Sequence, residues 1–107
     1  MQKHIFLIGP GAIGKTTLAK MLAKKLDVLD VHVDEEFIKR IGHIRKYIKK
    51  YSYDEYYASN SKLFYKLISE NKTRRCVFAV TPGLLIRGPE KIRKKNIEQI
   101  NKGLSIL

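Results

Sequence analysis

A glycine-rich segment near the N-terminus constrains this chain more than any other feature. It joins an apolar run, residues 5–8, to a helical pattern that begins at residue 15. Its eight residues match G-x-x-x-x-G-K-[ST] and read Gly9-Pro10-Gly11-Ala12-Ile13-Gly14-Lys15-Thr16. Glycines allow a tight turn whose backbone N–H groups point at one anion, and a helix N-terminus favours the same charge. With a strand before it and a helix after it, the motif predicts a nucleoside triphosphate site.

Each residue of this predicted site has a role that follows from its chemistry. Lys15 is expected to reach the β- and γ-phosphates and to offset charge that moves during phosphoryl transfer. Thr16 would supply a hydroxyl to Mg²⁺, and Thr17 is well placed for the α-phosphate. ATP and Mg²⁺ are therefore the expected ligands. The predicted phosphate-binding residues are Gly9, Gly11, Ala12, Ile13, Gly14, Lys15, Thr16 and Thr17.

Strand-like and helix-like patterns alternate along the chain. Short apolar runs predict strands over residues 3–8, 28–33, 76–80 and 104–107. Helical spacing of apolar residues predicts helices over residues 15–26, 35–41, 43–50, 54–69 and 89–100. This alternation predicts an α/β protein, a three-layer α/β/α P-loop NTPase fold around a parallel sheet, in one domain of residues 1–107.

Two of these helices have faces that can be predicted from residue spacing. The first should bury a stripe made of Leu18, Met21, Leu22 and Leu26. The longest helix should turn one face inward, made of Tyr53, Tyr57, Asn60, Phe64, Leu67 and Ile68. Residues 81–83 are expected to form a turn that ends the third strand.

The formal net charge of +12 suggests a polyanionic partner. However, each half of the chain carries 11 Lys and Arg against 5 Asp and Glu, and Lys outnumbers Arg 16 to 6. The charge is thus evenly spread and poor in the residue best suited to bases and phosphates. We expect no specific nucleic-acid partner, although a basic P-loop protein acting on nucleic acid stays open as an alternative. No apolar run predicts a membrane span, and the single cysteine, Cys76, favours a cytoplasmic location.

The P-loop and several segments after it resemble the shikimate kinase family of small-molecule P-loop kinases. The likeness covers residues 5–17, then Val33-Asp34, Arg40-Ile41-Gly42, residues 77–80 and Gly83. The resemblance implies the nucleoside-monophosphate-kinase/shikimate-kinase-like variant of the fold. It also implies ATP- and Mg²⁺-dependent phosphoryl transfer to a small hydroxylated metabolite. Because the family's lid follows the fourth strand, the chain is expected to be C-terminally incomplete, either a fragment or a naturally short relative.

The resemblance also implies an acceptor site. Asp34 would orient the acceptor hydroxyl and accept its proton, which makes Lys15 and Asp34 the predicted catalytic residues. A helix N-cap is the other interpretation of Asp34. Tyr57 and Asn60 lie where the family uses an arginine to hold the acceptor's carboxylate, and they would form a hydroxyl and amide pocket, or else simply a tyrosine-rich core with one satisfied Asn. Gly83 is the one glycine retained from the family's acceptor-binding turn.

Three departures from the family weaken the comparison with shikimate itself. His32 stands where a carboxylate near Mg²⁺ is expected, and a half-buried strand residue is its more ordinary interpretation. Tyr57 stands where the family has an arginine, and Pro82 has no N–H to donate to an acceptor. Arg87 could supply the missing positive charge, although a solvated surface residue is its more ordinary interpretation. A non-catalytic or degraded ATP-binding module, without the lid and acceptor groups, is therefore a second hypothesis. The oligomeric state stays open.

Overall fold

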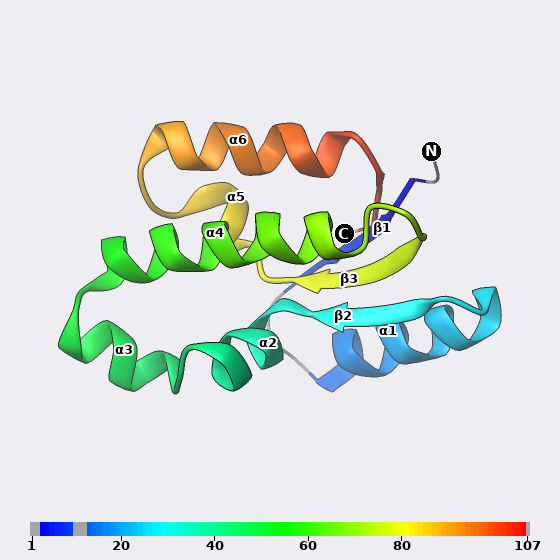
Figure 1. Cartoon of the computed structure of the whole chain (residues 1–107), viewed down its shortest axis with the longest axis horizontal. Helices are drawn as coiled ribbons and strands as arrows, with labels where there is room; N and C mark the ends of the chain where they lie inside the picture. Colours follow the sequence, from blue (N-terminus) through cyan, green and yellow to red (C-terminus); the bar gives the residue numbers. More distant parts are fainter. Residues whose placement is uncertain (1–2, 10–12, 107) are drawn as a thin grey trace.

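The computed structural model describes residues 3–9 and 13–106, and within them a single parallel sheet. The strand order is β2-β3-β1-β4, and every neighbouring pair is parallel. This order confirms the α/β architecture with a parallel sheet, which Figure 1 shows edge-on between its helices. The four strands are β1 (Ile5–Ile8), β2 (Leu29–His32), β3 (Cys76–Val80) and β4 (Leu104–Ile106).

Helices cover both faces of the sheet, which confirms the three layers (Figure 1). One face is covered by α1, and the other by α4 and α6 with the shorter helices at their ends. No helix in the described part of the chain has the length and apolar character that a membrane crossing requires. The helices are α1 (Ile13–Leu26), α2 (Val33–Arg40), α3 (Ile44–Lys50), α4 (Tyr53–Glu70), α5 (Gly83–Ile86) and α6 (Glu90–Asn101).

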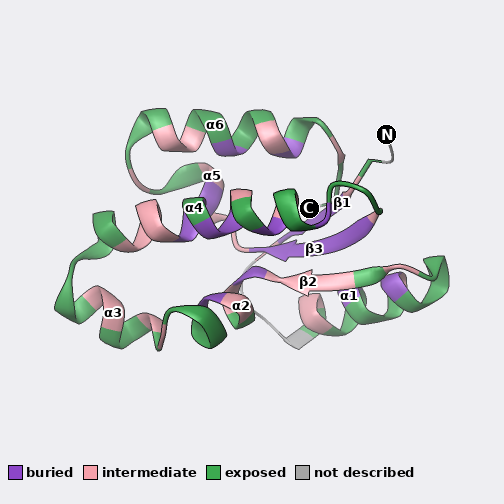
Figure 2. Cartoon of the chain, viewed as in Figure 1, coloured by how far each residue is buried: buried purple, intermediate pink, exposed green. Residues whose placement is uncertain are grey.

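The two central strands divide the core by simple alternation, because successive strand residues point to opposite faces. Figure 2 shows β3 buried along its whole length. On the α4 side, Phe6 lies 5.5 Å from Phe78 and 5.9 Å from Phe64, measured between ring centroids. On the α1 side the core is smaller. It contains Ile5, Leu7, Ala19, Ala23, Val77 and Ala79.

The predicted buried stripe of α1 is wrong for most of its residues. Leu18 and Met21 are 49% and 64% exposed, and Leu26 is 42% exposed, so only Leu22 of the four packs against the core. The buried positions are instead Ala19 and Ala23, at 0% and 2%. Small side chains one helical turn apart let the helix backbone approach the sheet closely, which larger leucines at those positions would prevent.

Two boundaries differ from expectation in ways that affect the site. The second strand ends at His32, and α2 begins at Val33 instead of residue 35. The N-cap residue is His32, so the interpretation of Asp34 as the N-cap is wrong; Asp34 lies inside the first turn. The segment expected as a turn continues into the short helix α5, whose Leu84 is buried against the core.

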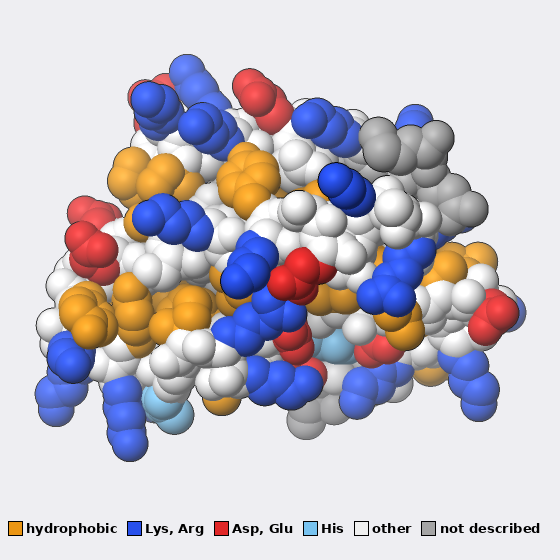
Figure 3. Space-filling model, in the orientation of Figure 1, with side chains coloured by type: hydrophobic (Ala, Val, Ile, Leu, Met, Phe, Trp, Pro, Cys, Tyr) orange, Lys and Arg blue, Asp and Glu red, His pale blue; other side chains and the backbone are white. Residues whose placement is uncertain are grey.

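Basic side chains are distributed over many elements, not gathered over one. In Figure 3, Lys and Arg appear along the whole visible face and are interrupted by acidic and apolar side chains. The four Lys and Arg of α3 and those of α6 lie in different parts of the molecule. This distribution matches the even spread of charge along the sequence.

Gly103 is required by the close approach of the α6–β4 connection to the first strand. A Cβ at this position would lie 2.4 Å from the carbonyl oxygen of His4 and 2.7 Å from the Phe6 ring. We expect Gly103→Ala to lower the free energy of unfolding by about 1–3 kcal/mol, because the backbone must shift to relieve the clash. Denaturant unfolding would measure the loss. The neighbouring exposed Lys102 supplies the control, since Lys102→Ala should change stability by less than about 0.5 kcal/mol. An equal effect of the two substitutions would contradict the prediction.

Candidate functional site

Several sequence-predicted residues meet at the carboxyl edge of the sheet, where ligands bind in open α/β proteins. Gly9 follows β1, and its N–H donates to the Val80 carbonyl at the end of β3, at 3.3 Å. Asp34 lies in the first turn of α2, directly after β2. The N-terminus of α1 reaches this same edge, so its unpaired N–H groups and the positive end of its dipole lie there.

Lys15 is anchored at the ends of the two central strands. Its Nζ donates to the carbonyl oxygen of Gly9 at 2.9 Å and to that of Val80 at 3.2 Å. Burial lowers the pKa of Lys15, and the negative charge of Asp34 partly offsets this effect. The ammonium is therefore held beside the glycine-rich segment and within electrostatic range of Asp34.

Asp34 links two other titratable groups, Lys15 and Tyr56, into a small cluster. Burial raises the pKa of Asp34; the Lys15 charge acts against this, and Glu35 adds to it. Burial also raises the pKa of Tyr56 to about 12, with further contributions from Asp34 and Tyr57. A carboxylate whose proton affinity is raised is better matched to accepting a proton from a hydroxyl than an ordinary surface Asp.

A narrow cavity of about 20 Å³ lies between α4, α5 and α6. The structure brings three residues predicted for the acceptor site, Tyr57, Asn60 and Gly83, together in its wall. Gly88, with φ of +82°, lies directly on Tyr57, because a Cβ there would come within 2.9 Å of the tyrosine Cβ. The remaining lining residues are Tyr56, Thr81, Leu84, Arg87, Ile92 and Asn96.

Asn96 is a cavity residue that sequence analysis missed. It is 1% exposed, and both ends of its amide are bonded: Oδ1 accepts from Ser61 Oγ at 2.7 Å, and Nδ2 donates to the Leu84 carbonyl at 2.8 Å. It thus ties α6 to both α4 and α5. The available signal was its place midway between Ile92 and Ile100, four residues from each and on one face of the helix.

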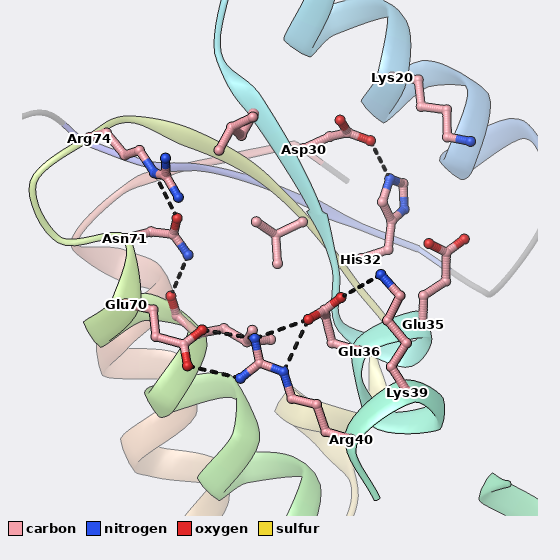
Figure 4. A pocket seen from close by; sticks show the side chains of 13 residues that line it. Lys20, Asp30, His32, Glu35, Glu36, Lys39, Arg40, Glu70, Asn71 and Arg74 are labelled. Carbon is pink, nitrogen blue, oxygen red and sulfur yellow. Dashed lines mark hydrogen bonds and ion pairs between the residues drawn. The ribbon is translucent and has the colours of Figure 1, made fainter. Parts of the chain in front are cut away.

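His32 lies in a different pocket, a hollow of about 340 Å³ along the β2 edge of the sheet (Figure 4). Its Nε2 is 2.6 Å from Asp30 Oδ2, in agreement with its interpretation as a half-buried strand residue. Arg40 donates to both carboxylate oxygens of Glu70, each at 2.9 Å, and to Glu36 at 3.1 Å. These groups satisfy one another, and exposed ion pairs of this kind add little stability.

Part of the predicted phosphate-binding segment lies outside the described residues. The structure does not describe Pro10, Gly11 or Ala12, nor the side chain of Ile13. Gly14 and Thr16 lie in the first turn of α1 and Thr17 directly follows it, with Thr16 half-buried and Thr17 exposed. Within residues 3–9 and 13–106, no group of three or more His, Cys, Asp or Glu is arranged to hold a metal ion. A magnesium ion here would depend on the Thr16 hydroxyl and on phosphate oxygens, a common arrangement for Mg²⁺.

Comparison with known proteins gives one consistent result. The family model of shikimate kinase matches residues 10–106. No curated protein matches the chain significantly. Among solved structures, shikimate kinase from Bacteroides thetaiotaomicron superposes with a TM-score of 0.77 at 22% identity, over 96% of this chain and 55% of that one. The enzyme from Aquifex aeolicus gives a TM-score of 0.74 at 23% identity, over 95% of this chain and 56% of that one.

A third solved structure is shikimate kinase from Acinetobacter baumannii in complex with shikimate. It gives a TM-score of 0.67 at 21% identity, over 98% of this chain and 55% of that one. At these identities the three structures establish the fold. The chain therefore spans slightly more than half the length of the solved structures that it matches.

Proposed function

Because the chain belongs to the shikimate kinase family, we propose that it contributes the nucleotide and acceptor sites of an ATP-dependent kinase that phosphorylates a small hydroxylated metabolite. The observation that carries this proposal is the cluster of Lys15, Asp34 and Tyr56 at the carboxyl edge of the sheet. The cluster places a cation for phosphate and a carboxylate for a hydroxyl within electrostatic range of each other. Tyr56 also lines the cavity between α4, α5 and α6, so this cavity adjoins the cluster.

The nucleotide side of the proposal fits the groups present. The α1 N-terminus and the Lys15 ammonium are suited to the β- and γ-phosphates, and Lys15 would exchange its bonds with the Gly9 and Val80 carbonyls for phosphate oxygens. Thr16 would hold Mg²⁺, which supplies charge neutralisation at the transferring phosphoryl group. Lys15 orients the terminal phosphate toward Asp34. The cytoplasmic location expected from the single cysteine stays part of this proposal.

The acceptor side depends on Asp34. Its carboxylate orients the reacting hydroxyl and takes its proton as the hydroxyl oxygen bonds the γ-phosphorus of ATP and the bond from that phosphorus to ADP breaks. The raised pKa of Asp34 favours this proton transfer. Tyr57, Asn60 and Gly83 form the wall against which the rest of the acceptor lies. Nucleotide and acceptor are thus the expected partners.

Phosphoryl transfer by the chain as it stands tests the proposal. The measurement pairs a thermal melt with and without Mg·ADP with an assay for ADP release in the presence of Mg·ATP and a panel of cyclic and linear polyols. Mg·ADP at about 100 times its Kd should stabilise the fold by about 2.7 kcal/mol, equivalent to roughly 10 °C or more in Tm. Acceptor-dependent ADP release supports the kinase. A shift without transfer to any acceptor supports the non-catalytic ATP-binding module instead, and no shift contradicts both.

A further inference from the structure

We propose that an apolar surface shared by α1 and β4 is the docking site for an amphipathic helix of a partner protein, and that this helix carries acidic residues beside its apolar face. The surface, called the α1–β4 surface below, consists of Leu18, Met21, Leu26, Leu104 and Ile106. None of these residues belongs to the nucleotide or acceptor groups described above, so the inference does not depend on the proposed kinase function.

One face of β4 is left open by the helices of the described residues. Leu104 pairs with Ile5 and Ile106 pairs with Leu7, and paired residues of neighbouring strands lie on the same face of a sheet. Ile5 and Leu7 face α1, so Leu104 and Ile106 do as well, yet these two are 49% and 45% exposed. On the opposite face of the sheet, α6 packs against β4. Because parallel sheets are normally covered by helices on both faces, the open face of β4 is suited to a further helix.

The side of α1 that looks toward this open face is apolar. Lys20 points the other way, into the hollow along the β2 edge (Figure 4). Leu18 lies two residues before Lys20, roughly 200° away around the helix, and Met21 lies on the same side as Leu18. These are exposed members of the stripe whose spacing predicts burial. A partner helix would bury them, so that α1 uses its alanines against the sheet and its larger apolar residues against the partner.

A hollow of about 570 Å³ connects the end of α1 to the start of β4. Its apolar wall is made of Leu26, Val28 and Leu104. All its lining residues lie at the end of α1 or near the starts of strands, so it opens at the amino edge of the sheet, away from the nucleotide site. A groove of this kind is the shape into which an amphipathic helix lays its apolar face, and exposed apolar patches with a polar rim mark interaction sites.

The charges around the surface favour an acidic partner. The α1 helix carries four Lys and no Asp or Glu. Lys25 lies four residues after Met21 and therefore on the same side of the helix. Lys3 and Arg75 line the hollow together with one carboxylate, Asp27. A second copy of this chain, with a net charge of +12, would bring more positive charge to these cations, whereas Asp and Glu beside the apolar face of a partner helix would complement them.

Two synthetic helical peptides test the inference on the full chain. Both carry one stripe of leucine and alanine; the remaining positions are mostly glutamate in the first peptide and lysine in the second. Binding is followed by fluorescence anisotropy at about 0.15 M salt, where attraction between distant surface charges is screened. We expect the glutamate peptide to bind in a 1:1 complex, and the lysine peptide to bind at least about 10-fold more weakly, because like charges would meet at the rim.

Substitutions in the α1–β4 surface should weaken this complex. Met21→Gln and Ile106→Thr remove apolar contacts but suit a helix and a strand, and each should raise the Kd of the glutamate peptide roughly 10-fold. Ile86→Gln is the matched control, since Ile86 is 64% exposed, as Met21 is, but lies in α5. It should leave the Kd unchanged. Because all three side chains are exposed, the variants should keep the wild-type Mg·ADP shift, which verifies that each is folded.

A charge reversal separates the rim from the overall charge of the protein. Lys25→Glu should weaken binding of the glutamate peptide and strengthen binding of the lysine peptide. Lys20→Glu makes the same change in net charge on the other side of α1, facing the β2 edge, and should alter both affinities far less.

Three results would overturn the inference. Equal affinity for the two peptides, or a Kd that Met21→Gln and Ile106→Thr leave unchanged, would show non-specific adhesion in place of docking. Self-association of the wild type in sedimentation experiments, abolished by the same two substitutions, would make a second copy the occupant of the surface. A chain that stays monomeric and binds neither peptide would show that the surface does not receive a helix.

Discussion

Lys15→Ala abolishes the Mg·ADP shift of the melting temperature and reduces phosphoryl transfer by at least about 10²- to 10³-fold, on the expectation that its ammonium is the principal charge facing the phosphates. Lys15 lies at the ends of β1 and β3, bonded to the Gly9 and Val80 carbonyls. No other basic side chain of the described residues shares those two contacts. An alanine there leaves the α1 N-terminus alone to face a highly charged ligand.

Lys20 supplies the control on the same helix. It is exposed and lies on the side of the β2 pocket, where Figure 4 shows it beyond Asp30 and His32. Lys20→Ala removes the same charge from the same helix, so non-specific attraction for a nucleotide falls equally in the two variants. Melts with and without Mg·ADP, followed by transfer assays, separate the two effects. A shift retained in Lys15→Ala, or lost equally in Lys20→Ala, would show that overall charge, not the glycine-rich motif, binds the nucleotide.

The layers and the parallel strands of the central sheet follow from patterns that the sequence carries locally. Apolar runs such as residues 76–80 must be buried on both faces, and a helix must return the chain between parallel strands. The buried face of α1 could not be found in this way. Leu18 and Met21 are more hydrophobic than Ala19 and Ala23, yet the alanines are buried. The distance between a helix and its sheet decides how large the side chains between them can be. The spacing of apolar residues along the sequence does not reveal that distance.

In the candidate site, too, some features follow from local sequence patterns and others depend on the tertiary fold. Gly9 and Asp34 depend on short spacings, and both directly follow the ends of strands in the structure, as the sequence predicts. The cavity depends on three segments far apart in the chain. Tyr57 and Asn60 could be anticipated as neighbours on one helix, but their meeting with Thr81 and Asn96 is a tertiary property. That Asn60 Oδ1 has no hydrogen-bond partner among the described residues is also a tertiary property, because any asparagine in a helix would look the same in sequence.

Asp34→Asn should abolish transfer and at the same time stabilise the free protein at neutral pH. Burial raises the pKa of Asp34 in the folded state, so the protonated carboxyl is favoured there. The stability that this group contributes is fully present below its unfolded pKa and is lost as the pH rises through the folded pKa. At neutral pH the wild type therefore carries an unfavourable buried charge that Asn lacks, whereas at pH well below the ordinary Asp range the two proteins should be equally stable.

Phosphoryl transfer, unlike stability, should decrease in Asp34→Asn. Removing a general base costs about 10²- to 10⁴-fold in rate, and the acid limb of the pH–rate profile should disappear with it, while the Mg·ADP shift is retained because Lys15 is intact. Asp54→Asn is the matched control, since Asp54 is an exposed carboxylate in the first turn of another helix, α4. That variant should keep full transfer and gain no stability, since a carboxylate at a helix N-terminus is mildly favourable. Retained transfer in Asp34→Asn would remove Asp34 from the chemistry. A loss of transfer with lower stability at neutral pH would assign it a structural role.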